Sequence, residues 1–322
     1  MPRLSLHRRS AVAAAFSAVL APSLWAQDSA AIEYVIGFAP GSSADAIGRL
    51  IAEQMSKTLG RSIIVNNKPG AGTTIAAQYV ATARAPMLFN ADFATLATMP
   101  HLMGKIPYDP EKDFAPISLF ARVPVMLAVS PSLPVNNLKE FIAWGKGQRD
   151  PVPYGSSGLG TPHHLAGELV KEMIGVQMAH VPYKGGGPAM NDLVAGQIAV
   201  AMLDVASAKA FVAAGKIRGI AVGSVQRSAA LPDVPTFHEQ GYPNFEATAW
   251  QALVASLATP ADQRLKFQEA LHAAMNSAPV KTRLDALGVE GIPGTPDQLM
   301  AFARTERARW GEVIRKHNIR ID

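Results

Sequence analysis

Residues 154–168, with the sequence YGSSGLGTPHHLAGE, hold the densest group of side chains and glycines that could do chemistry. A short apolar segment ends at Tyr154, and a loop of glycine and serine leads from it to Thr161. Leucine or methionine then recurs at every fourth position from Leu165 to Met173, as one face of a helix requires. Thr161 suits the N-cap of that helix, and Pro162 suits its first position. Because the first turn of a helix leaves backbone N–H groups unpaired, this order of strand, loop and helix predicts a site for a negatively charged group.

Two kinds of enzyme could use such a loop. Residues 155–161 match the spacing of a phosphate-binding P-loop, but Thr161 stands where the lysine belongs, which argues against triphosphate chemistry. The segment around Ser157 is similar to the G-x-S-x-G turn of serine hydrolases, but Leu159 replaces the second glycine. A secreted α/β serine hydrolase that uses Ser156 or Ser157 stays open as an alternative.

The histidines do not form a metal-binding pattern. His163 and His164 are adjacent, so their side chains diverge by about 100° on a helix and cannot easily chelate one ion. The chain has no cysteine, which excludes thiolate metal sites and catalytic thiols. We expect no metal and no cofactor. Asp204 follows an apolar strand and could either accept a hydrogen bond from a ligand or brace a loop.

The order of strand, glycine loop and helix recurs four times, with loops near residues 40, 70, 158 and 186. Strands that alternate with helices predict an α/β fold with mainly parallel sheets and ligand loops at the carboxyl ends of the strands. Two such loops in each half predict two lobes that face one another across a cleft. The apolar runs 117–129 and 248–256 are candidates for strands that cross between the lobes. The predicted organisation is residues 27–126 and 248–322 for lobe one and 127–247 for lobe two.

The first 26 residues indicate export. Arg3, Arg8 and Arg9 precede an apolar run from Ala11 to Leu20, and Ala26 is a small residue at the expected cut. This run is too short to span a bilayer, so it predicts a cleaved signal peptide and a periplasmic protein. The formal net charge of +5 includes these three arginines, so cleavage lowers it to +2. No cluster of Lys and Arg with interleaved aromatic residues follows, so we expect no nucleic-acid partner.

Six segments, in order along the chain, support a specific resemblance. They are residues 38–45 (FAPGSSAD), 67–72 (NKPGAG), 107–114 (PYDPEKDF), 154–168, 180–189 (HVPYKGGGPA) and 231–236 (LPDVPT). From about Tyr34 to the C-terminus, the chain resembles the periplasmic substrate-binding proteins of tripartite tricarboxylate transporters, the Bug receptors.

The resemblance implies a two-lobed Venus-flytrap fold, in which crossing strands join two lobes and each lobe is a mainly parallel sheet flanked by helices. It further implies a non-catalytic, monomeric receptor without a cofactor. Such a receptor closes on a small carboxylate-bearing metabolite and delivers it to the membrane permease subunits of a transporter. A sensory binding protein would differ only in its partner, so that alternative stays open.

The resemblance also implies which residues bind the ligand, mainly through backbone amides and hydroxyl groups. In lobe one they are Phe38, Pro40, Gly41, Ser42, Ser43, Asp45, Ala71, Gly72 and Thr73. In lobe two they are Ser156, Gly160, Thr161, His164 and Asp204. Asp45 also suits the first turn of a helix simply because the helix dipole favours a carboxylate there.

Overall fold

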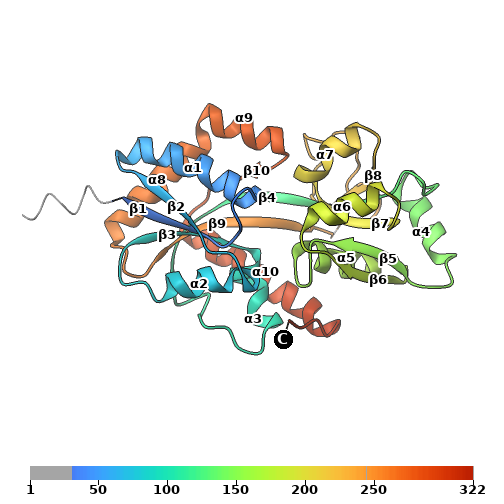
Figure 1. Ribbon diagram of the computed structural model, residues 1–322, viewed down its shortest axis with the longest axis horizontal. Helices are drawn as coiled ribbons and strands as arrows, with labels where there is room; N and C mark the ends of the chain where they lie inside the picture. Colours follow the sequence, from blue (N-terminus) through green and yellow to red (C-terminus); the bar gives the residue numbers. More distant parts are fainter. Residues whose placement is uncertain (1–30, 244, 322) are drawn as a thin grey trace, which may run out of the picture.

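The computed structural model describes residues 31–321 apart from residue 244, so the predicted signal peptide lies outside the described residues. Two α/β lobes lie side by side, and the long strand β4 (Phe114–Val129) runs from one into the other (Figure 1). Within the described part of the chain, no helix is long and apolar enough to cross a membrane.

Lobe one is built on a sheet with the strand order β2-β1-β3-β9-β4, and β10 pairs with the middle of β4, at Ala121 and Arg122. Helices α1, α8 and α9 cover one face of this sheet, and α2, α3 and α10 cover the other (Figure 1). The strands are β1 (Ile32–Ile36), β2 (Ile63–Asn67), β3 (Met87–Asp92), β4, β9 (Thr248–Ser256) and β10 (Glu290–Gly291). The helices are α1 (Ser43–Leu59), η1 (Ala71–Thr73), α2 (Thr74–Ala81), η2 (Ala94–Thr98), α3 (Met99–Leu102), α8 (Ala261–Asn276), α9 (Ala278–Leu287) and α10 (Pro296–Lys316).

Lobe two continues the same path of strands as β4-β7-β5-β6, with β8 also paired to β4. Helices α4 and α5 pack on one face of this sheet, and α6 and α7 pack on the other. Its further strands are β5 (Val152–Ser156), β6 (Met178–Pro182), β7 (Val200–Asp204) and β8 (Arg218–Val222). Its helices are α4 (Leu138–Lys146), α5 (Pro162–Ile174), α6 (Gly186–Val194) and α7 (Val205–Ala213).

Both sheets are mixed, which corrects the prediction of mainly parallel sheets. Parallel pairing holds among β2, β1 and β3 and among β7, β5 and β6, where helices connect successive strands. The pairings of β4 with β9, β7, β8 and β10 are antiparallel, as is that of β3 with β9. Strand β4, which leaves lobe one and enters lobe two, is therefore antiparallel to its neighbours in both sheets.

The second crossing differs from the expected strand 248–256. Strand β9 pairs only with β3 and β4 in lobe one, and its first residue lies opposite Pro124. The chain returns from lobe two just before β9. There Gly223 N–H donates to Val125 O at 2.7 Å, and Ala247 N–H donates to Gly223 O at 2.8 Å. These hydrogen bonds place the two connections between the lobes side by side, and we call this part of the molecule, around Val125, Gly223 and Ala247, the hinge.

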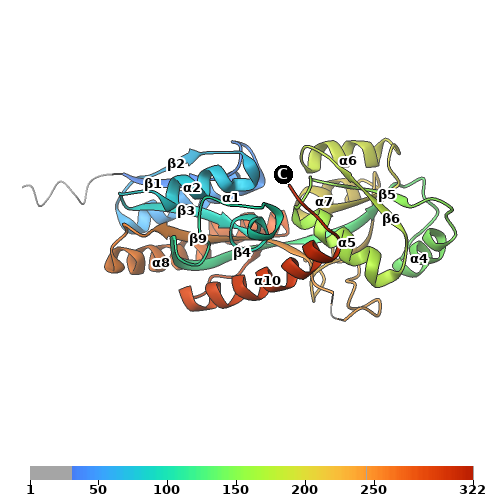
Figure 2. The same cartoon turned by 90° about the horizontal axis from the view of Figure 1, so that it is seen from below.

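Helix α10 packs against both lobes. It runs beneath lobe one and ends beside α5 of lobe two (Figure 2). At that end Lys316 Nζ lies 2.5 Å from Glu172 Oε1, and His317 Nδ1 lies 3.1 Å from Glu168 Oε2. The C-terminal helix therefore supports the hinge from one side.

Gly223 should tolerate no side chain, because a Cβ there would lie 2.8 Å from Ala247 O and 3.0 Å from Val125 O. We expect Gly223→Ala to lower the free energy of unfolding by about 1–3 kcal/mol, since backbone would have to shift. Urea denaturation measures this loss. Gly104→Ala is the matched control, because a Cβ at Gly104 meets nothing within 4 Å. Equal stability of the two variants would contradict the close packing at the hinge.

Candidate ligand-binding site

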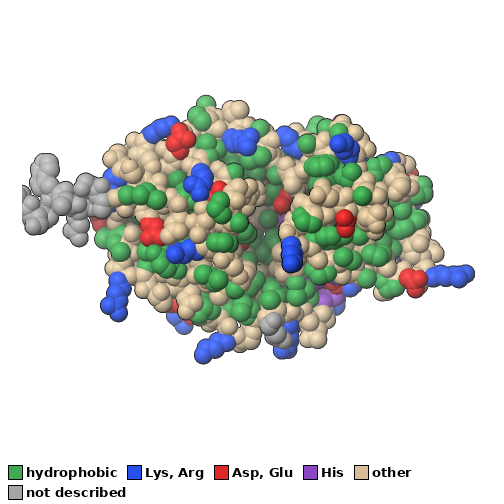
Figure 3. All heavy atoms as spheres, viewed as in Figure 1, with side chains coloured by type: hydrophobic (Ala, Val, Ile, Leu, Met, Phe, Trp, Pro, Cys, Tyr) green, Lys and Arg blue, Asp and Glu red, His purple; other side chains and the backbone are tan. Residues whose placement is uncertain are grey.

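The predicted loops lie where parallel strands end and helices begin. The loops near residues 40 and 70 follow β1 and β2 in lobe one, and those near residues 158 and 186 follow β5 and β6 in lobe two. Strands β3 and β7 are parallel to these strands and end on the same sides of the sheets. The surface of the molecule is hollowed between the two lobes (Figure 3). A Cβ built on Gly160 would lie 2.5 Å from Leu102 Cδ1, which shows how closely the lobe-two loop approaches lobe one. Each helix start adds positive potential to this hollow.

The first loop is held by a buried carboxylate. Asp45 Oδ2 accepts hydrogen bonds from Gly41 N at 2.9 Å and Arg49 Nε at 3.0 Å, and Oδ1 accepts from Asn67 Nδ2 at 2.8 Å. Burial by itself would raise the pKa of Asp45, but the hydrogen bonds from Arg49, Gly41 and Asn67 outweigh it and lower that pKa. Asp45 is only 3% exposed, so its carboxylate supports the loop from within lobe one.

The start of α1 supplies donors on the other side of this loop. Ser42 is the N-cap, and its Oγ accepts from Asp45 N at 3.2 Å. Helix geometry leaves the N–H groups of Ser43 and Ala44 without an intrahelical partner. Ser43 is exposed, whereas Ala44 is buried, so the N–H group of Ser43 is the more accessible of the two donors.

The second loop has an unusual backbone. Four consecutive residues have positive φ angles, namely Gly70 (131°), Ala71 (46°), Gly72 (57°) and Thr73 (72°). Left-handed conformations cost energy at Ala71 and Thr73, and such strain is concentrated at functional sites. The Thr73 hydroxyl points into the lobe and lies 2.7 Å from Thr95 Oγ1, whereas Ala71 and Gly72 are exposed.

The third loop rests on two stacked histidines. The rings of His164 and His180 lie 3.7 Å apart with an interplanar angle of 14°. Ser156 Oγ lies 2.6 Å from His180 Nε2, and His164 Nδ1 accepts from Gly160 N at 3.0 Å. Burial lowers the pKa of His164 to about 3 and that of His180 to about 4, so both rings are neutral at pH 7. The two rings hold Ser156 and Gly160 from beneath.

The neighbouring histidine, His163, is buried and lies between Ser157 and Asp204. Its Nδ1 is 2.6 Å from Ser157 Oγ, and its Nε2 is 2.9 Å from Asp204 Oδ1. The predicted binding residues include His164 but not His163, and Ser157 was named only for the hydrolase alternative. Pro162 at the first helical position was a usable signal, because it places His163 at the second position, next to the loop.

The predicted site residues therefore divide by exposure. Exposed at the loops are Pro40, Gly41, Ser43, Ala71 and Gly72. Partly exposed are Phe38, Ser42, Thr161 and Asp204. Buried beneath the loops are Asp45, Thr73, Ser156, Gly160 and His164. Among the described residues, no group of three or more His, Asp or Glu side chains is arranged to hold a metal ion.

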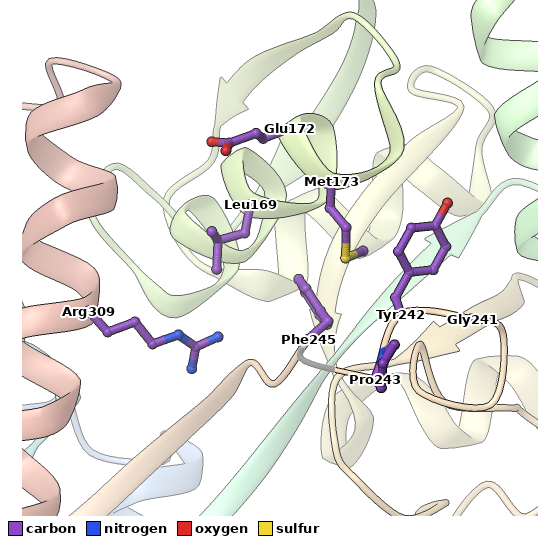
Figure 4. Close-up of a pocket in the computed structure, with 8 residues that line it drawn as sticks. All are labelled: Leu169, Glu172, Met173, Gly241, Tyr242, Pro243, Phe245 and Arg309. Atoms are coloured by element: carbon purple, nitrogen blue, oxygen red, sulfur yellow. The ribbon is translucent and has the colours of Figure 1, made fainter.

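A separate hollow of about 390 Å³ lies away from these loops, between α5, α10 and the segment before β9 (Figure 4). It is lined by Leu169, Glu172, Met173, Gly241, Tyr242, Pro243, Phe245 and Arg309. Arg309 contacts Glu306 at 3.6 Å and donates to Glu246 O. Its guanidinium already has partners, so this hollow lacks a free cation for a carboxylate.

Two α/β lobes on a shared strand, with helix starts facing a hollow between them, define the architecture of a periplasmic binding protein. The chain belongs to the receptors of the tripartite tricarboxylate transporter family, whose family model matches residues 47–319. Protein BugT of Bordetella pertussis is 32% identical over 293 residues, which cover 90% of each chain. The resemblance seen in the sequence is confirmed.

Solved structures agree with this assignment. MatC from Rhodopseudomonas palustris with bound malate superposes with a TM-score of 0.75 at 32% identity, covering 88% of this chain and 98% of that one. An R. palustris protein with adipate gives a TM-score of 0.81 at 32% identity, covering 90% of this chain and 97% of that one. The two-lobed α/β fold expected from the sequence is thus confirmed.

Acidification from pH 7 to pH 5 should destabilise the protein through His164 and His180. Their folded pKa values, about 3 and about 4, lie below the ordinary value of 6.5, so the unfolded chain binds protons that the folded state does not. Above about pH 6.5 this difference in proton binding does not lower the free energy of unfolding. As the pH falls below that value, the free energy of unfolding decreases by up to about 1.4 kcal/mol per pH unit for each of the two protons. Urea denaturation at pH 7, 6 and 5 measures the slope.

Substitution of one of the two histidines tests whether the stacked pair causes this pH dependence of stability. The amide of His180→Gln can still bond to Ser156, and we expect this variant to reduce the slope by about one proton. His238→Gln removes an exposed histidine of the same lobe and should keep a slope close to that of the wild type. A wild-type slope in His180→Gln would show that the stacked pair does not cause the pH dependence.

Proposed function

We propose that this chain is a periplasmic receptor that captures a small carboxylate-bearing metabolite between its two lobes for a tripartite tricarboxylate-type transporter. The observation that carries the proposal is the set of helix starts, with unpaired N–H groups, on both sides of the hollow. Relatives with bound malate and adipate support a carboxylate as the ligand class. Preorganised N–H donors bind an anion without a costly rearrangement.

In this proposal the ligand contacts backbone more than side chains. Lobe one contributes the start of α1 at Ser42 and Ser43 and the exposed backbone of Ala71 and Gly72, with Phe38, Pro40 and Gly41 around them. Lobe two contributes Thr161 and Asp204. We assign Asp45, Thr73, Ser156, Gly160 and His164 to positioning the loops, because their polar atoms already have partners within the chain or are buried.

Capture would proceed by hinge closure. A carboxylate that bridges both lobes makes its full set of contacts only when they are closed, so binding favours that state. The hinge is the point where β4 passes from β9 to β7, beside Gly223. We further propose cleavage of the signal peptide after Ala26, a monomeric mature protein and the transporter's permease subunits as partner.

Ser43→Pro tests the role of the α1 amides. Proline suits the first helical position, and Ser42 already has the extended backbone that must precede proline, with φ −67° and ψ 160°. The substitution therefore removes one N–H group and keeps the helix. We expect the affinity for carboxylates to fall about 10-fold to 100-fold, as for loss of a hydrogen bond to a charged group.

Calorimetry with malate, succinate and adipate measures that loss. Ser43→Ala is the control, because it keeps the N–H group and loses only the hydroxyl. Equal affinities of Ser43→Pro and wild type would contradict a carboxylate at this helix start. Binding of neutral sugars, with no carboxylate bound, would overturn the proposed function.

The serine hydrolase remains a second candidate, because Ser157, His163 and Asp204 are the residue types of a catalytic triad. Their arrangement argues against it. In a hydrolase triad the serine bonds to Nε2 of the histidine and the acid bonds to Nδ1, whereas here Ser157 contacts Nδ1 and Asp204 contacts Nε2. In addition, the buried Asp204 Oδ1 receives no well-aligned hydrogen bond. We therefore expect no hydrolysis of p-nitrophenyl esters above that of the Ser157→Ala variant. Turnover that this variant abolishes would establish the enzyme instead.

A further inference from the structure

We propose that Ser157, His163 and Asp204 recognise a hydrogen-bond donor on the ligand, so that this receptor prefers carboxylates that carry an amino or hydroxyl group. The inference rests on the proposed function and specifies its ligand class. It starts from the contacts of Asp204, which is the partly exposed acid of the lobe-two loops.

Asp204 lies beside the point where β4 passes from lobe one to lobe two. It ends β7 and is paired with Val125, the residue at which β4 leaves β9 and joins β7. The next residue, Val205, lies against lobe one, because a Cβ built on Gly288 would be 3.1 Å from Val205 Cγ1. A ligand held between the lobes therefore has Asp204 beneath it.

The carboxylate of Asp204 is not used by its own helix. Asp204 is the N-cap of α7, a position where aspartate ordinarily accepts from a backbone N–H group, but its side chain makes no such hydrogen bond. Its Oδ1 is buried beside His163 Nε2 and receives no well-aligned hydrogen bond. Its Oδ2 has no hydrogen-bond partner among the described residues. The side chain is 27% exposed, so this acceptor is open to a ligand.

His163 determines which hydrogen-bonding groups face the ligand. A carboxylate oxygen accepts, so the ring proton of His163 belongs on Nε2, which lies 2.9 Å from Asp204 Oδ1. Nδ1 is then an acceptor, and the Ser157 hydroxyl must donate to it across 2.6 Å. The proton of Ser157 is thereby used, and its oxygen, in a partly exposed residue, remains an acceptor. Both Ser157 and Asp204 thus require a donor from the ligand.

The charge of Asp204 also orients the ligand. Two carboxylates placed close together repel one another, so the ligand carboxylate must lie toward the helix starts of lobe one. The ligand group nearest Asp204 is then an ammonium or a hydroxyl. A donor that meets a carboxylate of this kind raises affinity by about 10-fold to 100-fold over the same molecule without it.

Calorimetry on the mature wild-type protein tests this preference with three matched sets of probes. They are propanoate, lactate and alanine; succinate, malate and aspartate; and glutarate, 2-hydroxyglutarate and glutamate. In the set that binds most tightly, we expect the hydroxyl or amino member to bind at least about 10-fold more tightly than the unsubstituted member. Equal or tighter binding of the unsubstituted member overturns the inference and leaves the proposed function standing. Absence of binding in all three sets overturns both.

Variants of two residues separate recognition from a general structural role. Asp204→Asn removes the charge and should reduce the preference to within about 3-fold, while the unsubstituted member binds more tightly because the like charge is gone. His163→Phe keeps a ring but breaks the contacts to Ser157 and Asp204, and it should also reduce the preference. A merely structural role would weaken all three members of a set equally, and that outcome would contradict the inference.

Asp150→Asn is the matched control. Asp150 is an exposed acid just before β5, at the opposite end of the parallel strands from Asp204. The same change of charge there should keep the wild-type preference. Loss of the preference in Asp150→Asn would show that net charge, not Asp204, determines it. The wild-type comparison needs no variant, so the inference stays testable even if Asp204→Asn does not fold.

Discussion

Strand β4 is hydrogen-bonded in both lobes, with Phe114 to Pro124 paired to β9 and Val125 to Val129 paired to β7. This sharing constrains everything else in the molecule. The backbone hydrogen bonds fix the register of β4 with β9 in one lobe and with β7 in the other. The two sheets therefore cannot slide independently along β4. The carboxyl ends of the parallel strands are therefore brought to the same hollow, and the helices that follow them begin there.

Buried polar groups then hold the loops in place. Asp45, Ser156 and His164 each hydrogen-bond to a loop N–H group or a neighbouring side chain. A buried polar group without a partner is costly, so each of these residues limits its loop to the few conformations that satisfy it. The donors that remain unpaired are those at the helix starts, which face the hollow. A binding site made of backbone in this way is preorganised, and its specificity must come from the few side chains beside it. In lobe two, the side chains that we propose for this role are those of Ser157, His163 and Asp204.

Local features of the fold were predictable from the sequence. Thr161 was expected to cap a helix with Pro162 at its first position, and both features are present in α5. Helix α4 is likewise local in origin, since it has an amphipathic pattern and an N-cap at Asn137. The pairing of strands was harder, because it depends on residues far apart in the chain. The mixed sheets and the restriction of β9 to lobe one follow from contacts such as that of Pro124 with Thr248, which no local pattern records.

In the candidate site, too, some features depend on the local sequence and others on tertiary contacts. The sequence by itself determined that glycine loops precede helix starts and that the chain belongs with carboxylate receptors, because capping residues, glycines and motifs act over a few neighbouring positions. Only the tertiary structure decided what surrounds each of the side chains next to these loops. His163 and His164 are adjacent and chemically identical, yet one packs on His180 and the other contacts Asp204. That difference arises because a helix turns about 100° per residue and because β6 and β7, distant in sequence, supply the two partners.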